Sequence, residues 1–244
     1  TQRFKRSSKR GELWLRLAEL YVEKARFIEF RLQKTFDQRL QRYQQGEIKT
    51  RPTINLSPAQ TYNKRAIRLY EWFLRDFPND EKVPQALFFL GYNYFELGNV
   101  NKGKTFYQRL TNEFPSSPYV DESNFALGEY HFDNTQWRRA LGHYLKVADN
   151  PRSRLFSFSL YKAAWCQYKI GRLKKALSSL ERVIRQGRKA KSEGRSSESG
   201  VSRIRLANEA LKDLVVFYAE VGTAQAAESY FSRVVGSGSA TKLL

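Results

Sequence analysis

Cysteine, histidine and methionine are almost missing from this sequence of 244 residues, which has one cysteine, two histidines and no methionine. A single cysteine excludes an internal disulfide framework and a zinc site built from several cysteines, and two histidines leave little room for a histidine-based metal centre. We therefore expect no metal and no cofactor. Because an initiator methionine is missing, we expect the chain to be a processed or excised piece, so the lack of a signal peptide does not identify its compartment.

Long apolar runs and acidic residues are also scarce. No run approaches the ~18–20 apolar residues that a membrane-spanning helix needs. The 24 Asp and Glu residues are outnumbered by 43 Lys and Arg, which gives a net charge of +19 at pH 7. A charge of this sign favours acidic partners, namely nucleic acid, an anionic membrane surface or an acidic protein. The hydrophobic content of 41%, with 17 Phe and 14 Tyr, excludes wholesale disorder and provides for a buried core.

A pattern of small and aromatic residues repeats through the middle of the chain. Gly91 lies on the apolar stripe of one expected helix, Gly98 breaks the chain, and Gly103 and Tyr107 lie on the stripe of a second helix. The small residues that correspond to one another in successive units are Gly91, Gly128 and Ala164. This pattern resembles the tetratricopeptide repeat (TPR), in which a small residue lets two antiparallel helices pack closely and a proline closes the unit.

The resemblance implies an all-α fold, namely a right-handed α-solenoid of about five TPR-like helix pairs with an elongated N-terminal helix. The first helix is predicted to run for about 33 residues, or about 50 Å. Residues 57–60, Ser-Pro-Ala-Gln, are expected to start the second helix as a capping box. The predicted parts are, in chain order, a basic flexible tail (1–11), an atypical first helix pair with a long helix and a long connection (12–78), three regular TPR units (79–186), a basic Gly/Ser-rich loop (187–203), a last TPR unit (204–236) and a flexible end (237–244).

The repeat frame places five side chains of each first helix on the concave surface of the solenoid. These 25 positions hold nine acidic, two basic and nine aromatic residues, so a basic protein is predicted to have an acidic, aromatic groove. Besides the candidate groove residues given below, the positions are Glu12, Leu15, Glu19, Val22, Glu23, Gln85, Glu122, Phe158, Lys169, Glu209, Lys212, Val216, Ala219 and Glu220. Such a groove suits a protein or peptide with apolar anchors and basic residues, because aromatic rings offer large contact areas and stack on cations. The candidate groove residues are Phe88, Tyr92, Phe95, Glu96, Phe125, Glu129, Phe132, Asp133, Tyr161, Trp165 and Tyr168. The alternative is that part of these rings pack between repeats and that some carboxylates only stabilise helix dipoles.

Two basic segments stand apart from the groove. The opening ten residues contain five bases and no acid, and a second segment contains Arg185, Arg188, Lys189 and Lys191. We predict that these four residues form a patch for an anionic partner, either an acidic protein or an anionic membrane surface on the convex side. The alternative for both segments is a solvated surface. Neither segment interleaves aromatic residues with its bases, so base stacking with nucleic acid is not indicated.

The sequence contains no recognised catalytic constellation: His131 and Cys166 are expected in the core, and His143 has no Ser or Cys partner in a known motif. We expect a non-enzymatic scaffold that holds a protein partner, with the long first helix as a second docking surface. The alternative is a helical repeat that associates with nucleic acid or an anionic membrane through its basic outer surface.

The repeat junctions ELGN and FPSSPY are most similar to those of TPR proteins of the bacterial cell envelope, of the outer-membrane assembly lipoprotein and Tol-associated periplasmic coordinator types. This similarity implies a periplasmic or cell-envelope location in a Gram-negative bacterium, with the cytoplasm as the alternative.

Overall fold

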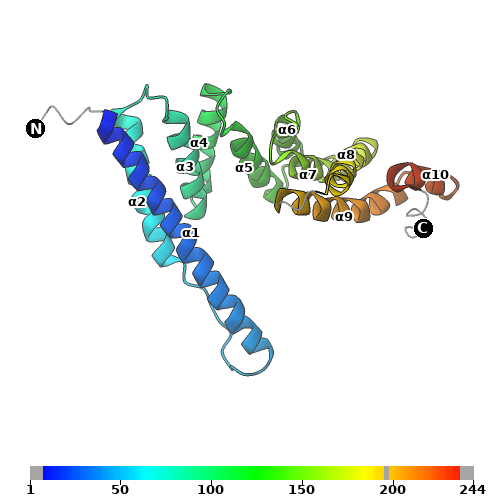
Figure 1. Cartoon of the computed structure of the whole chain (residues 1–244), viewed down its shortest axis with the longest axis horizontal. Helices are drawn as coiled ribbons and strands as arrows, with labels where there is room; N and C mark the ends of the chain where they lie inside the picture. The colour runs from blue at the N-terminus through cyan, green and yellow to red at the C-terminus, as the bar shows by residue number, and fades with distance from the viewer. Residues whose placement is uncertain (1–7, 195–197, 237–244) are drawn as a thin grey trace, which may run out of the picture. The chain divides into compact units, whose positions relative to one another are not determined.

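Helices follow one another along the whole described chain, as the repeat pattern predicts (Figure 1). The computed structural model describes residues 8–194 and 198–236, which form ten α-helices and no strand. The helices make five pairs, and the chain divides into two compact units, Thr1–Val120 and Asp121–Leu244. The predicted fold class, an α-solenoid of TPR-like helix pairs with an elongated first helix, is confirmed.

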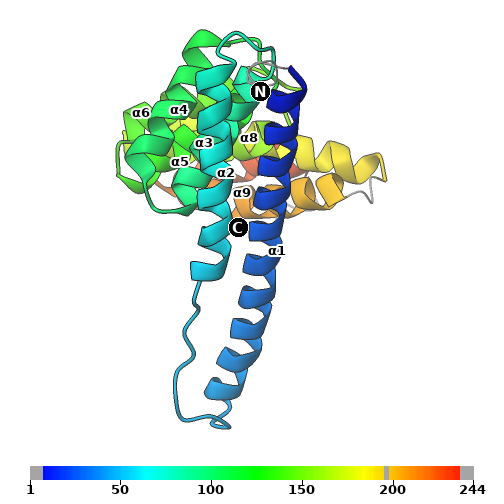
Figure 2. The ribbon, with the colours of Figure 1, turned by 90° about the vertical axis from the view of Figure 1, so that its left-hand side faces the viewer.

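The first unit contains two helix pairs. Its helices are α1 (Ser8–Gln44), α2 (Ser57–Asp76), α3 (Val83–Glu96) and α4 (Val100–Glu113). With 37 residues, α1 is about 55 Å long. It runs antiparallel beside the shorter α2, and its far end extends past α2 before the chain turns back (Figure 2). The side chains of Leu15, Ala18, Val22 and Ala25 recur every three or four residues on one face of α1 and are buried. From residue 26 to residue 44, in contrast, no residue of α1 is fully buried.

Three details of the first unit differ from the sequence prediction. Leu15 and Val22 were expected on the concave surface, but they belong to the core. Ser57 does not act as a helix cap, because Leu56 is the N-cap residue and the Gln60 backbone N–H donates to the carbonyl oxygen of Leu56 in the first helical turn. Residues 8–11, predicted as part of a flexible tail, are the first turn of α1, while residues 1–7 lie outside the described residues.

The second unit contains three helix pairs. Its helices are α5 (Val120–Asp133), α6 (Trp137–Ala148), α7 (Phe156–Lys169), α8 (Leu173–Ser192), α9 (Glu198–Ala219) and α10 (Ala224–Val235). Its largest core cluster joins side chains of α7, α8, α9 and α10, among them Leu160, Leu180, Phe217 and Phe231. Burial of such a continuous apolar cluster is what holds stacked helix pairs together, because one pair alone cannot cover its own apolar face.

Glycines bring the two helices of a pair close together at the predicted positions. A Cβ atom at Gly91 of α3 would lie 2.6 Å from ring carbons of Tyr107 in α4, well inside ordinary contact distance. The same holds for Gly128 of α5 and the Tyr144 ring of α6, also at 2.6 Å. The small residue and the large ring therefore form one packing unit that recurs in successive helix pairs.

The segment 187–203, predicted as a Gly/Ser-rich loop, is helical at both ends. Helix α8 continues through Ser192, α9 begins at Glu198, and residues 195–197 lie outside the described residues. Gly187 does not mark a loop but a close approach of α8 and α9, since a Cβ atom there would lie 2.3 Å from the Cβ atom of Ala207. Residues 237–244, predicted as a flexible end, are also outside the described part of the chain.

Candidate functional site

The predicted groove residues of α3 have different surroundings. Phe88 stacks on Tyr119, with 5.0 Å between ring centroids, and Phe95 packs against Tyr107 at 5.4 Å, so both rings contribute to the packing of the first unit. Tyr92 is covered by α1, because the Arg26 guanidinium lies 4.5 Å above its ring and donates a hydrogen bond of 3.2 Å to its hydroxyl.

Glu96, at the end of α3, remains exposed. Burial raises the pKa of Glu29 on α1, and the negative charge of Glu96 acts in the same direction. This effect indicates that carboxylates of α1 and α3 are close enough to repel one another. Glu96 has no ion pair among the described residues.

The predicted groove residues of α5 are largely engaged within the second unit. Phe125 and Phe132 both contact the ring of Tyr144, at 5.7 and 6.4 Å. Glu129 accepts hydrogen bonds from the Tyr144 hydroxyl and from the Lys162 ammonium group of α7, the latter at 3.0 Å. Asp133 is exposed and has no ion pair within the described residues.

The candidate aromatic groove residues of α7 all contact α9. The Tyr161 hydroxyl and the Trp165 indole N–H both donate to Oδ2 of Asp213 on α9, at 2.6 and 3.0 Å. Burial raises the pKa of Tyr161 to about 12, and the bond to Asp213 acts in the same direction, so this hydroxyl stays protonated. The Tyr168 hydroxyl donates to Glu220, and its ring stacks on Phe217 with a centroid distance of 4.1 Å.

Two exposed apolar side chains extend this surface. Phe158 of α7 is 38% exposed and Val216 of α9 is 56% exposed. Phe158 lies seven residues before Trp165 and therefore on the same face of α7. We call the surface formed by Phe158, Tyr161, Trp165, Tyr168 and Val216 the α7–α9 surface.

Asp213 was not among the residues predicted from the sequence. Its two donors are 48 and 52 residues away, so no local pattern connects them. A signal for Asp213 is nevertheless present in the sequence. Residues 209, 213, 216 and 220 follow one another at intervals of four, three and four, which places Asp213 on the same face of α9 as three predicted groove positions.

Many of the predicted acidic residues are partnered inside the protein. Glu19 pairs with Arg16, Glu122 with Arg154, Glu129 with Lys162 and Glu209 with Lys212. These contacts reduce the negative charge that a partner would meet, so the groove positions are less acidic in effect than their composition indicates.

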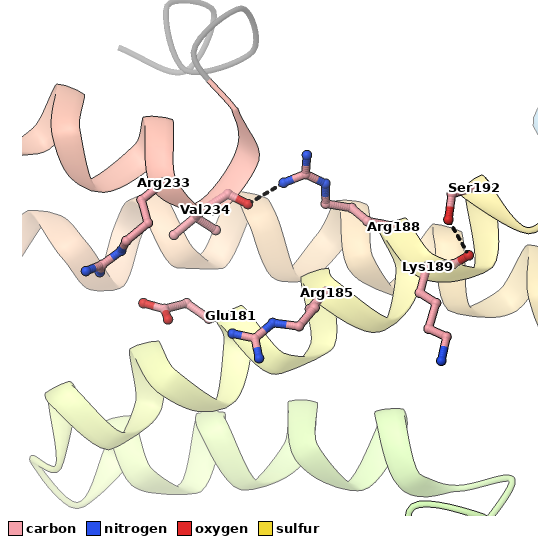
Figure 3. A pocket seen from close by; sticks show the side chains of 7 residues that line it. All are labelled: Glu181, Arg185, Arg188, Lys189, Ser192, Arg233 and Val234. Carbon is pink, nitrogen blue, oxygen red and sulfur yellow. Dashed lines mark hydrogen bonds between the residues drawn. The ribbon is translucent and has the colours of Figure 1, made fainter.

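The predicted basic patch is brought together in part. Arg185, Arg188 and Lys189 of α8 line a pocket of about 530 Å³, and Arg233 of α10 joins them (Figure 3). Lys191 instead lines a neighbouring pocket that faces α9. Arg233 was not predicted from the sequence, because it lies in a different helix, 41 residues beyond Ser192 at the end of α8.

The outward face of α1 carries a row of exposed apolar side chains. Their spacing of three or four residues, or multiples of it, places most of them on the side of α1 opposite its buried face. They are Leu13, Leu17, Leu20, Phe27 and Phe30.

The two histidines form a stacked pair between α5 and α6, with ring centroids 5.4 Å apart. Nδ1 of His131 lies 2.7 Å from Oε1 of Gln136, and Nδ1 of His143 lies 3.0 Å from Oδ1 of Asn124. His131 is buried, as expected, and so is Cys166. Within residues 8–194 and 198–236, no group of three or more His, Cys, Asp or Glu side chains is placed to hold a metal, and no helix is both long and apolar enough to cross a membrane.

Two segments of the chain, residues 85–117 and 158–186, match the family model of the tetratricopeptide repeat. They cover most of α3, α4, α7 and α8, so the prediction made from Gly91 and Ala164 is confirmed for these two helix pairs. TPR proteins generally bind other proteins, and they are generally non-catalytic. A search of curated proteins found no match.

Several solved structures are similar in fold. A crystal structure of the MamA protein is 20% identical over 68% of this chain and 90% of its own, with a TM-score of 0.44. A second structure, of MamA from AMB-1, is 17% identical over 82% of this chain and 97% of its own, with a TM-score of 0.40. A Podosopora anserina protein with nearly identical TPR-like repeats is 15% identical over 87% of this chain and 96% of its own, with a TM-score of 0.47.

Proposed function

We propose that this protein is a non-catalytic scaffold that binds a segment of a partner protein on the α7–α9 surface. The presence of tetratricopeptide repeats supports the general role, since such repeats generally serve protein binding. One observation supports the location: Tyr161 and Trp165 are both held by Asp213, so these aromatic side chains are fixed before a partner arrives. A fixed ring loses little conformational freedom on binding, which favours affinity.

The surface favours a partner with apolar anchors. Phe158 and Val216 offer apolar area that solvent reaches, and Trp165 joins α7 to α9 through its hydrogen bond to Asp213. Aromatic residues supply much of the energy of protein interfaces when they are surrounded by groups that exclude water. The proposed preference for basic residues in the partner rests on Asp213 of α9 and Glu220 next to its end, the two carboxylates that accept hydrogen bonds from the aromatic side chains of this surface.

A displayed library of random peptides, panned against the immobilised protein, tests this proposal. We expect selected peptides to be rich in aromatic and aliphatic residues with Lys or Arg. Their affinity should fall at least fivefold for Phe158→Ala, which corresponds to about 1 kcal/mol. Leu145→Ala is the matched control, because Leu145 of α6 is 37% exposed and lies on a second helix of the same unit.

Three results would contradict the proposal. The first is selection of acidic peptides, and the second is an equal loss of affinity for Phe158→Ala and Leu145→Ala. The third is a loss of affinity for Leu20→Ala on α1 but not for Phe158→Ala, which would place the partner on the exposed row of the first unit.

A location in the cell envelope is part of the same proposal. It rests on the repeat junctions ELGN and FPSSPY. Fractionation of a Gram-negative source organism, followed by immunoblotting, should find the protein with periplasmic or outer-membrane markers. Co-purification with ribosomes or nucleic acid that is lost steeply as salt is raised would instead support the alternative of a nucleic-acid-associated repeat.

A further inference from the structure

Four cationic side chains gather around one pocket between α8 and α10 in the second unit. Arg185, Arg188 and Lys189 come from α8 and Arg233 from α10, and the pocket has a volume of about 530 Å³. Arg188 and Lys189 follow Arg185 by three and four residues, so the helix places both beside Arg185 on one side of α8. Figure 3 shows the side chains of the two helices around this space.

Among the residues that the structure describes, one acidic side chain lines the pocket. It is Glu181, and its Oε1 accepts a hydrogen bond of 2.7 Å from the Tyr230 hydroxyl. Within the described residues Arg185 has neither a hydrogen-bond partner nor an ion-pair partner. Lys189 forms an ion pair of 3.9 Å with Glu193, so the three arginines remain against the single negative charge of Glu181. This leaves an excess of two positive charges in a small volume, and such an excess is unfavourable until an anion neutralises it.

Two of the arginines are held in place before any ligand binds. Nη1 of Arg188 donates a hydrogen bond of 2.6 Å to the carbonyl oxygen of Val234, which joins α8 to the end of α10 (Figure 3). The Arg233 guanidinium lies 5.3 Å from the centre of the Tyr230 ring. Fixed guanidinium groups lower the entropic cost of binding an anion, because fewer rotamers are lost.

We infer that this pocket binds a phosphomonoester group and that Arg185, Arg188 and Arg233 are the residues that hold it. A phosphomonoester carries nearly two negative charges and three acceptor oxygens, so it matches several guanidinium groups at once. A carboxylate has one charge and two oxygens and would leave more of the positive charge uncompensated. The volume exceeds what a phosphate group alone needs and is within the range of small-ligand pockets, so the site can also take part of the molecule that carries the group.

The source of the group is either a small phosphorylated molecule or a phosphorylated side chain. Both present the same chemistry, and they are distinguished by comparing free O-phospho-L-serine with a short phosphoserine peptide. This inference does not depend on the α7–α9 surface, which involves other residues. Phe158→Ala should therefore leave phosphate binding unchanged, even if the proposed protein-binding function fails.

Isothermal titration calorimetry of the full chain with O-phospho-L-serine, and separately with the phosphopeptide, tests the inference. We expect binding by the wild type and at least tenfold weaker binding by Arg185→Ala and by Arg233→Ala, since a hydrogen bond to a charged group contributes about a factor of ten or more. The double variant should show no measurable binding. Arg185 is exposed and makes no hydrogen bond or ion pair with the described residues, so its substitution should leave the fold intact. If circular dichroism shows that Arg233→Ala unfolds, Arg185→Ala alone keeps the test valid.

The matched control is the double variant Lys174→Ala/Lys175→Ala. Both lysines are exposed on α8 and neither lines the pocket, so this variant loses the same charge as the double arginine variant. We expect it to bind like the wild type. Equal weakening in both double variants would overturn the inference, because net charge would then explain the affinity.

Two other results would also overturn it. One is equal affinity for L-aspartate and O-phospho-L-serine, which would show that the pocket does not select phosphate. The other is binding to phosphatidylserine vesicles with none to either phosphorylated probe, which would identify the patch as a membrane-contacting surface.

Discussion

A methyl group added at Gly128 should destabilise the protein, whereas one added at Gly142 should stabilise it. Both glycines lie in one helix pair, Gly128 in α5 and Gly142 in α6. A Cβ atom at Gly128 would lie 2.6 Å from Cε1 and 2.8 Å from Cδ1 of Tyr144, while one at Gly142 would meet nothing within 4 Å. The two variants therefore separate close helix packing from the general preference of a helix for alanine.

The expected free energies follow from these distances. Alanine is favoured over glycine in a helix interior by about 1 kcal/mol, and Gly142→Ala should gain about that amount. For Gly128→Ala the Tyr144 ring would have to move by about 1 Å to reach an ordinary carbon–carbon distance. That ring is fully buried, and its hydroxyl donates to Glu129. Overpacking of this kind costs about 1–3 kcal/mol, so Gly128→Ala should lose about 1 kcal/mol net, and the two variants should differ by about 2 kcal/mol.

Urea unfolding monitored by circular dichroism measures both values. Trp137 and Trp165 lie in the second unit and provide a fluorescence signal as well. If Gly128→Ala proved as stable as Gly142→Ala, α5 and α6 would not be packed around Tyr144 as described. Gly91→Ala extends the test to the first unit, where Tyr107 occupies the corresponding place at the same distance of 2.6 Å.

Three further predictions concern single side chains. Burial, followed by the neighbouring His131, lowers the pKa of His143 from 6.5 to about 4, so stability should be full above pH 6.5 and decrease toward pH 4 as only the unfolded chain takes up the proton. A shift of this size corresponds to about 3 kcal/mol in the free energy of unfolding, and solvent screening of the half-buried ring reduces this to about 1–2 kcal/mol. His143→Gln should remove this part of the pH dependence, as measured by urea unfolding. Burial raises the pKa of the Cys166 thiol to about 12, so a thiol reagent at pH 7.5 should label it only in urea, and labelling of the native protein within minutes would contradict its placement. Leu15→Ala should cost about 2–4 kcal/mol and Leu17→Ala less than about 1 kcal/mol in thermal or urea unfolding, since Leu15 is 3% and Leu17 is 39% exposed; equal losses would contradict the orientation of α1.

The sequence was sufficient to predict the helix pairs of the regular repeats. Gly91 and Gly128 are needed because a large ring from the second helix occupies the space of their missing side chains, and this requirement leaves a spacing that can be read from one sequence. For the first helix pair, the sequence did not identify which face of α1 is buried. Apolar residues occur on nearly all sides of α1, so periodicity identified the helix but not which of Leu15 and Leu17 is buried.

The interpretation of residues 187–203 as a loop shows a limit of composition. Glycine and serine favour loops, but they also let two helices approach closely. Gly187 serves the second purpose, because Ala207 of α9 occupies the space where its side chain would be. Ala207 lies 20 residues after Gly187 in the sequence, so only the packing of α8 against α9 shows that Gly187 belongs to a helix contact and not to a loop.

The candidate groove residues show that the number of acidic side chains on a face does not give the negative charge that a partner meets there. The repeat frame identified Trp165 and Tyr161 from spacing alone, yet their polar groups are already bonded to Asp213. Glu129 likewise holds both Tyr144 and Lys162. A carboxylate that satisfies internal donors attracts a ligand cation less strongly than a free one, because part of its field is already neutralised. Contacts of this kind orient the aromatic rings and at the same time neutralise acidic charge. We therefore expect apolar anchors to dominate recognition on the α7–α9 surface, and the placed guanidinium groups of Arg185, Arg188 and Arg233 to dominate it in the pocket between α8 and α10.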